Sequence, residues 1–166
     1  TSGIFYHEDC KGHITPEGHP ESCERLAVIL DRLDDPQFKG LKKFTAKAAS
    51  LESLQLVHTR QHIENVLGHI PSSGHYSLDA DTHLSQGSGD AALKAAGATC
   101  QAIDAVLADE IDNAFCAIRP PGHHAEPDQA MGFCLFNNVA IGALYARKEY
   151  SCHRVAIIDF DVHHGN

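Results

Sequence analysis

The fold is decided by the stretch Arg154–Asn166, which reads R-V-A-I-I-D-F-D-V-H-H-G-N. Its apolar run, residues 155–158, is typical of a strand buried on both faces of a parallel sheet. Side chains alternate along extended backbone, so Asp159, Asp161 and His163 point to the same side just beyond that strand. Carboxylates gathered at a buried edge repel one another and lose hydration, so this grouping indicates a bound cation.

A second apolar strand, residues 113–118, leads into a loop, R-P-P-G-H-H, that ends with His123 and His124. The paired prolines exclude a helix at the start of that loop. A helix over 137–150 follows, so the order from residue 113 is strand, loop, helix, strand. This order predicts a right-handed βαβ unit with adjacent parallel strands. Both loops then leave the same sheet edge, and their two His-His pairs (the second being 163–164) share one crevice with the two Asp residues.

The remaining elements are predicted from hydrophobic periodicity and capping signals. Ser50 and Thr59 are expected N-caps of two short helices. The polar segment 71–89 is a long loop, which in a compact domain is functional or disordered. The other predicted elements are strands at 2–7 and 42–48 and helices at 25–34, 51–57, 60–70 and 90–109.

Bulk composition excludes some classes of function. The chain has 166 residues, enough for one domain with a real core. Its net charge of −9, from 13 Lys and Arg against 22 Asp and Glu, argues against a nucleic-acid partner. No stretch has the length of a membrane span. Six cysteines without a C-x-x-C motif indicate reduced thiols, so we expect a cytoplasmic protein, or a nuclear one if the source is eukaryotic.

Residue chemistry divides the roles at the crevice. Asp161 and His163 are natural metal ligands, and oxygen plus imidazole suits Zn²⁺, which uses three protein ligands in catalytic sites. No third ligand is evident in the chain. His123 and His124 are the expected base and acid toward a water molecule, and Asp159 could orient a histidine of the other loop.

Two blocks resemble signature motifs of the histone deacetylase family. They are Arg119–Asn138, R-P-P-G-H-H-A-E-P-D-Q-A-M-G-F-C-L-F-N-N, and Val155–Asn166. Both are most similar to its class II and bacterial deacetylase-like amidohydrolase branch, and His19-Pro20-Glu21 with Arg25 resembles the family's first loop and helix. The resemblance implies a three-layer α/β/α fold with a mainly parallel sheet (arginase/deacetylase-like), of which this chain is the N-terminal portion of a single catalytic domain.

The resemblance also implies a zinc-dependent amidohydrolase that removes acetyl groups from acetylated lysine peptides or acetylated small amines. Asp161 and His163 would be zinc ligands, with the third ligand outside this chain. His123 would be the general base, paired with Asp159, and His124 its partner in proton transfer. A K⁺ ion would be held by Asp159, Asp161 and the backbone of His163.

Substrate-contacting residues are implied in the same way. Phe133 would wall the acyl-lysine tunnel, and the carbonyl of Gly132 would accept the substrate amide. Asp81 would hold the substrate backbone at the rim, and Arg25 would lie where acetate leaves. From the residues alone, Asp81 could equally form a turn, Phe133 could belong to the core and Arg25 to a helix surface.

Two departures from the family pattern matter. Asn166, which would stand beside His124, is Asp in many relatives, and an amide would leave the pKa of His124 lower than a carboxylate would. The family's second zinc Asp and its carbonyl-polarising Tyr or His lie downstream of residue 166. We therefore expect the 166-residue piece to be inactive by itself and the full-length protein to be an enzyme.

Two rival functions remain at this point. Binuclear Mn²⁺ ureohydrolases of the related arginase fold place D-x-H-x-D at this strand end, whereas Gly165 occupies the last position here. The second rival is a catalytically silent relative that binds acylated amines. The sequence does not separate protein lysine from polyamine substrates, and it leaves a homo-oligomer open.

Overall fold

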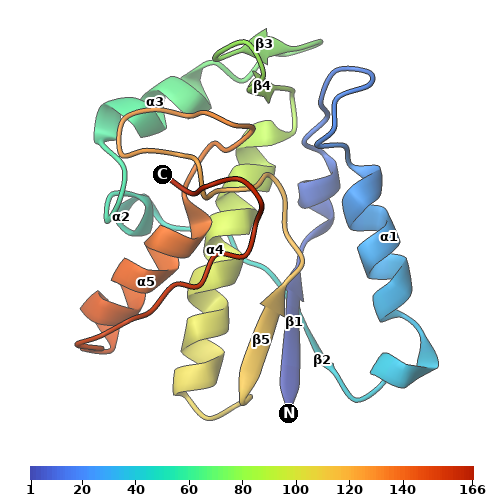
Figure 1. Ribbon diagram of the computed structural model, residues 1–166, viewed down its shortest axis with the longest axis vertical. Coiled ribbons are helices and arrows are strands. Elements are labelled where there is room, and N and C mark those ends of the chain that lie inside the picture. Colours follow the sequence, from blue (N-terminus) through green and yellow to red (C-terminus); the bar gives the residue numbers. More distant parts are fainter.

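The sheet at the centre of the molecule contains three parallel strands in the order β2-β1-β5 (Figure 1). The computed structural model describes all of residues 1–166. β1 (Ser2–Tyr6) lies between β2 (Lys42–Thr45) and β5 (Asn113–Cys116), with Phe5 opposite Phe44 and Cys116 in the two registers. All three strands were predicted at these positions.

Helices cover both faces of this sheet. Ile4 belongs to a cluster with Leu26 of α1 (Glu24–Leu33), whereas the next residue, Phe5, packs with alanines of α4 (Ser88–Leu107). Because neighbouring side chains of a strand point to opposite faces, α1 and α4 lie on opposite sides of the sheet. Figure 1 shows α1 on one side and α4 with α5 (Asn138–Glu149) on the other. The predicted three-layer α/β architecture is therefore confirmed.

Small residues let α4 approach its neighbours closely. A Cβ atom on Gly97 would lie 1.9 Å from the carbonyl oxygen of Lys47, so only glycine permits the chain after β2 to cross this helix. On α5, a Cβ on Gly142 would lie 2.4 Å from the side chain of Thr99. This close packing fixes α5 and the loop before it.

The remaining elements are short. Ser50 and Thr59 accept the predicted capping hydrogen bonds, from the amides of Ser53 and His62. None of the helices combines the length and apolar character needed to cross a membrane. The elements are the 3₁₀ turns η1 (Glu8–Lys11) and η2 (Pro36–Phe38), and the helices α2 (Leu51–Leu54) and α3 (Arg60–Gly68).

The segment 71–89 is more ordered than predicted. It contains a small antiparallel pair, β3 (Tyr76–Ser77) and β4 (His83–Leu84). The side chain of Asp79 accepts hydrogen bonds from the amides of Asp81 and Thr82, which closes the turn between the two strands.

The prediction of a buried strand at 155–158 is wrong for this chain. Residues 151–166 form no regular element, and the side chains of Ile157 and Ile158 are 52% and 87% exposed. β5 has β1 as its one strand neighbour, so the predicted adjacency within a βαβ unit is wrong as well. The free edge of β5 is not paired with this run, and no second layer covers it, so its apolar side chains stay exposed.

Candidate active site

His123 and Asp159 meet as predicted, although no strand precedes Asp159. The Nδ1–H of His123 donates to Asp159 Oδ2 at 2.8 Å, and Asp159 Oδ1 accepts the amide of Asp161 at 3.1 Å. The hydrogen bond from His123, followed by the one from the Asp161 amide, lowers the pKa of Asp159. Since Asp159 occupies Nδ1, we assign the lone pair of His123 to Nε2, where it can accept a proton.

His124 is paired with Asn166. Its Nδ1 lies 3.0 Å from Asn166 Oδ1, and its ring centroid lies 4.1 Å from that of His123. The Asn166 side-chain amide donates in turn to Glu126 Oε1 at 3.0 Å, and its backbone amide donates to the carbonyl of His123 at 3.0 Å. These bonds orient the Asn166 oxygen toward His124, so His124 donates at Nδ1 and its Nε2 also carries a lone pair.

Asp161 and His163, the expected metal ligands, lie side by side. Asp161 Oδ1 lies 3.2 Å from His163 Nδ1 and accepts the His163 backbone amide at 2.8 Å, and this backbone bond lowers the pKa of Asp161. Two ligands bound tetrahedrally to one zinc ion lie about 3.3 Å apart, so this oxygen–nitrogen pair fits zinc. No third His, Cys, Asp or Glu side chain of this chain joins them.

A cavity of about 550 Å³ joins these groups to the expected substrate residues. Its lining includes His123, His124, Asp161 and His163, and also Arg25, Asp81, Gly132 and Phe133. Predicted site residues from four separate segments of the chain therefore share one space. His164 and Asn166 instead line an adjoining cavity of about 360 Å³, which also touches Asp159.

Gly132 and Phe133 occupy a tight turn between Met131 and Cys134. Both have positive φ, 55° and 69°, and Met131 and Cys134 exchange backbone hydrogen bonds across the turn, as in a type I′ turn. Positive φ is unfavourable for a bulky residue, so the turn holds Phe133 in a strained conformation at the cavity. A Cβ atom on residue 132 would lie 2.5 Å from His124 Cδ2, so glycine is required beside that ring.

Asp81 lines the cavity, whereas the side chain of Asp79 makes the turn, and the Asp81 carbonyl lies 3.0 Å from His19 Nε2. Arg25 shows both of its expected features: its side chain is 61% exposed, and it lines the cavity beside Glu21 at 3.4 Å. The carbonyl of Gly132 already accepts the thiol of Cys134 at 3.3 Å and keeps a second lone pair.

Sequence reasoning missed His58, which is buried in the turn just before α3. Its Nδ1 lies 2.9 Å from the carbonyl of Glu126, and its Nε2 accepts the amide of Asn137 at 2.8 Å. One imidazole thus joins both ends of the loop that carries Gly132 and Phe133. Burial lowers its pKa to about 4, which keeps it neutral and able to accept. No sequence signal pairs residue 58 with residues 126 and 137.

Comparison with known proteins identifies the relatives of this chain. A family model described as histone deacetylase domain matches residues 19–166. The histone deacetylase-like amidohydrolase of Pseudomonas aeruginosa is 42% identical over 90% of this chain and 39% of its own length. Histone deacetylase 5 of Arabidopsis thaliana is 38% identical over 99% of this chain and 27% of its own length. The polyamine deacetylase HDAC10 of Homo sapiens is 36% identical over 99% of this chain and 26% of its own length.

A solved structure agrees with these matches. The crystal structure of the HDA15 HD domain superposes with a TM-score of 0.80 at 29% identity, covering 89% of this chain and 44% of that one. The chain thus spans less than half of the length of these relatives. The motifs that carry the site, residues 119–138 and 155–166, fall inside the matched region. The chain belongs to the histone deacetylase family.

Proposed function

We propose that the full-length protein is a deacetylase that hydrolyses the amide bond of acetylated lysine or of another acetylated amine. The observation that carries this proposal is the His123–Asp159 pair, which opens into the same cavity as Asp161 and His163. The family match supports the reaction class, and the matched relatives include both a histone deacetylase-like amidohydrolase and a polyamine deacetylase.

His123 is the proposed general base. With Nδ1 bound to Asp159 at 2.8 Å, its Nε2 accepts the proton of the attacking water, and the carboxylate stabilises the imidazolium that forms. His124, held by Asn166 at 3.0 Å, lies beside it and assists transfer of a proton to the leaving amine. Because its partner is an amide and not a carboxylate, His124 has less support for a positive charge than His123 has.

Asp161 and His163 would hold a zinc ion in this proposal. When bound, zinc supplies Lewis-acid chemistry that polarises the acetyl carbonyl and acidifies water. Gly165 argues against the binuclear ureohydrolase alternative, because glycine supplies no carboxylate to bridge a second metal ion. The K⁺ ion expected at Asp159, Asp161 and the His163 backbone remains part of the proposal.

The substrate residues act around this centre. Phe133 packs against the acyl chain, and Gly132 offers its carbonyl to the amide N–H. The Asp81 carboxylate accepts hydrogen bonds from substrate N–H groups at the rim, and the Arg25 guanidinium attracts the acetate product. All four line the cavity that also contains His123.

The test is acetate release by zinc-loaded full-length protein from a panel of acetyl-lysine peptides and acetylated polyamines. Turnover of at least one class is expected, and elemental analysis of the protein as purified, before any zinc is added, should find one zinc per chain. Two manganese ions per chain, or binding of the panel without turnover, would reject the proposal in favour of one of the two alternatives.

A further inference from the structure

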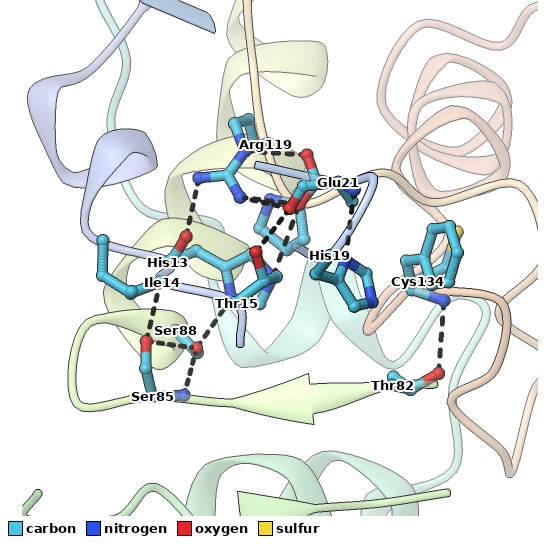
Figure 2. Close-up of polar contacts among 12 residues, drawn as sticks. His13, Ile14, Thr15, His19, Glu21, Thr82, Ser85, Ser88, Arg119 and Cys134 are labelled. Carbon is cyan, nitrogen blue, oxygen red and sulfur yellow. Dashed lines mark hydrogen bonds and ion pairs between the residues drawn. The ribbon is translucent and has the colours of Figure 1, made fainter. Parts of the chain in front are cut away.

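Arg119 is the first residue of the loop that carries His123 and His124, and its side chain is buried. Its side chain is 3% exposed, and its partner Glu21 is 2% exposed. The guanidinium has five N–H groups, and each of them donates a hydrogen bond (Figure 2). Two go to the Glu21 carboxylate at 2.7 and 2.6 Å, one to the Glu21 carbonyl at 3.3 Å, and two to the carbonyls of Cys10 and His13 at 2.9 and 2.7 Å.

This arrangement joins segments that are far apart in the sequence. Arg119 lies four residues before His123, whereas its partners Cys10, His13 and Glu21 belong to η1 and to the segment between η1 and α1. Residues 19–25, named here the wall segment, run into the first turn of α1 and form the side of the cavity that contains Pro20, Glu21 and Arg25. The ion pair therefore ties one side of the cavity to the loop that carries the proposed base.

Contacts continue from Glu21 to the substrate residues. The Glu21 backbone amide donates to His19 Nδ1 at 3.1 Å, so the His19 Nε2–H donates to the Asp81 carbonyl at 3.0 Å. The His19 ring meets the Phe133 ring edge to face with centroids 4.6 Å apart, and Figure 2 shows His19 between Glu21 and the Thr82–Cys134 region. The Glu21 carboxylate also contacts Arg25 at 3.4 Å. The position of Glu21 thus sets the positions of His19 and Arg25.

Stability alone does not explain why a charged pair, Arg119 and Glu21, is buried here. Two buried charges lose so much hydration that a well-packed apolar pair is often equally stable. An apolar pair cannot replace the directional hydrogen bonds that Arg119 donates to three backbone carbonyls and one carboxylate. The nearby His13 adds no charge, because burial lowers its pKa to about 3, so its 3.7 Å contact with Glu21 joins a neutral ring to the carboxylate.

We infer that Arg119 is a positioning residue for the deacetylase reaction, holding the wall segment in register with the loop that carries His123 and His124. This inference rests on the proposed function for its kinetic consequence. Its structural consequence is independent of turnover: without Arg119, the wall segment loosens while the α4–sheet core remains intact.

Three variants of the full-length protein test this role. R119K keeps a positive charge but has three donors for five acceptor contacts. E21M/R119M removes both buried charges together, which avoids leaving one unpaired. The matched control is R60M/E64M, which removes an exposed Arg–Glu pair on α3 whose side chains are 75% and 55% exposed.

Hydrogen–deuterium exchange gives the first readout. In R119K and E21M/R119M, amides of residues 13–25 should exchange about tenfold faster or more, while those of α4 stay within about twofold. R60M/E64M should match wild type at both places. Unchanged exchange at 13–25, or equal acceleration throughout the protein, would overturn the inference, because either result means that Arg119 does not act locally on the wall segment.

Steady-state kinetics gives the second readout. In the variants, kcat/KM on the best substrate should fall about 10- to 100-fold at a temperature well below unfolding, because small displacements of positioning groups are costly. Wild-type kcat/KM in a variant with a loosened wall segment would contradict the kinetic part. A wild-type protein that turns over no acetylated amine would defeat the proposed function, and the exchange data would still decide whether Arg119 holds the wall segment.

Discussion

At the scale of single residues, the site depends on which partner each histidine has. His123 has a carboxylate at 2.8 Å, and His124 has an amide oxygen at 3.0 Å. An ionised partner stabilises an imidazolium and a neutral amide does so less, which supports the base role proposed for His123. These pairings could be predicted from the motifs, because their residues follow fixed offsets. The choice of Asp79 over Asp81 as turn former could not, since both residues lie in one polar run.

Replacing Asp159 with Asn tests the pairing at this scale. The amide removes the charge that supports the His123 imidazolium, so kcat/KM should fall about 100-fold or more. The free energy of unfolding should change little, because the Asp159 side chain is 38% exposed. D31N, on the exposed surface of α1, is the control. Activity of D159N within twofold of wild type would show that this carboxylate does not assist the base.

At the scale of elements, short-range sequence signals predicted most helices and strands. The exception is the strand expected at residues 155–158, whose formation depends on pairing with a distant part of the chain. The N-caps Ser50 and Thr59 act within one helical turn, so they could be predicted directly from the sequence. The apolar run 155–158 carries no information about the strand edge that it would need, and here none pairs with it. The polar residues that follow this run still reach the site, because Asp159 and Asn166 are hydrogen-bonded to the loop that carries His123.

His58 links elements in a way that periodicity does not reveal. H58A should leave the carbonyl of Glu126 and the amide of Asn137 without their partner, lowering the free energy of unfolding by about 2–4 kcal/mol. The loop that carries Phe133 should loosen, so kcat/KM falls as well. Chemical denaturation and kinetics at low temperature measure the two effects.

The control for this variant is H153A, at an exposed position, where a change within about 0.5 kcal/mol is expected. A similarly small effect of H58A on unfolding would mean that His58 does not anchor the loop.

At the scale of the whole molecule, buried neutral histidines make stability depend on pH. Burial lowers the pKa of His13 to about 3 and of His58 to about 4, and burial also lowers the pKa of His62. In the unfolded chain these rings titrate near 6.5, so acid protonates the unfolded state first. The free energy of unfolding should therefore fall as pH drops from about 7 to about 4, by about 1.4 kcal/mol per pH unit for each such ring.

Denaturant unfolding of the full-length protein at several pH values between 7 and 4 checks this expectation. Carboxylates with lowered pKa, such as Asp79 and Asp159, add their loss only at lower pH, below their ordinary value near 4. If the free energy of unfolding stays constant or rises as the pH drops from 7 to 5, these histidines are protonated in the folded protein.

The most direct measurement of the central claim is acetate release by zinc-loaded full-length protein, compared with its H123A variant, on the best substrate of the acetyl-lysine and acetylpolyamine panel. Wild type should turn the substrate over. H123A should keep the fold by circular dichroism and lose activity by about 100-fold or more, because the proton acceptor at the cavity is gone. Wild-type activity in folded H123A would contradict the assignment of His123 as the base.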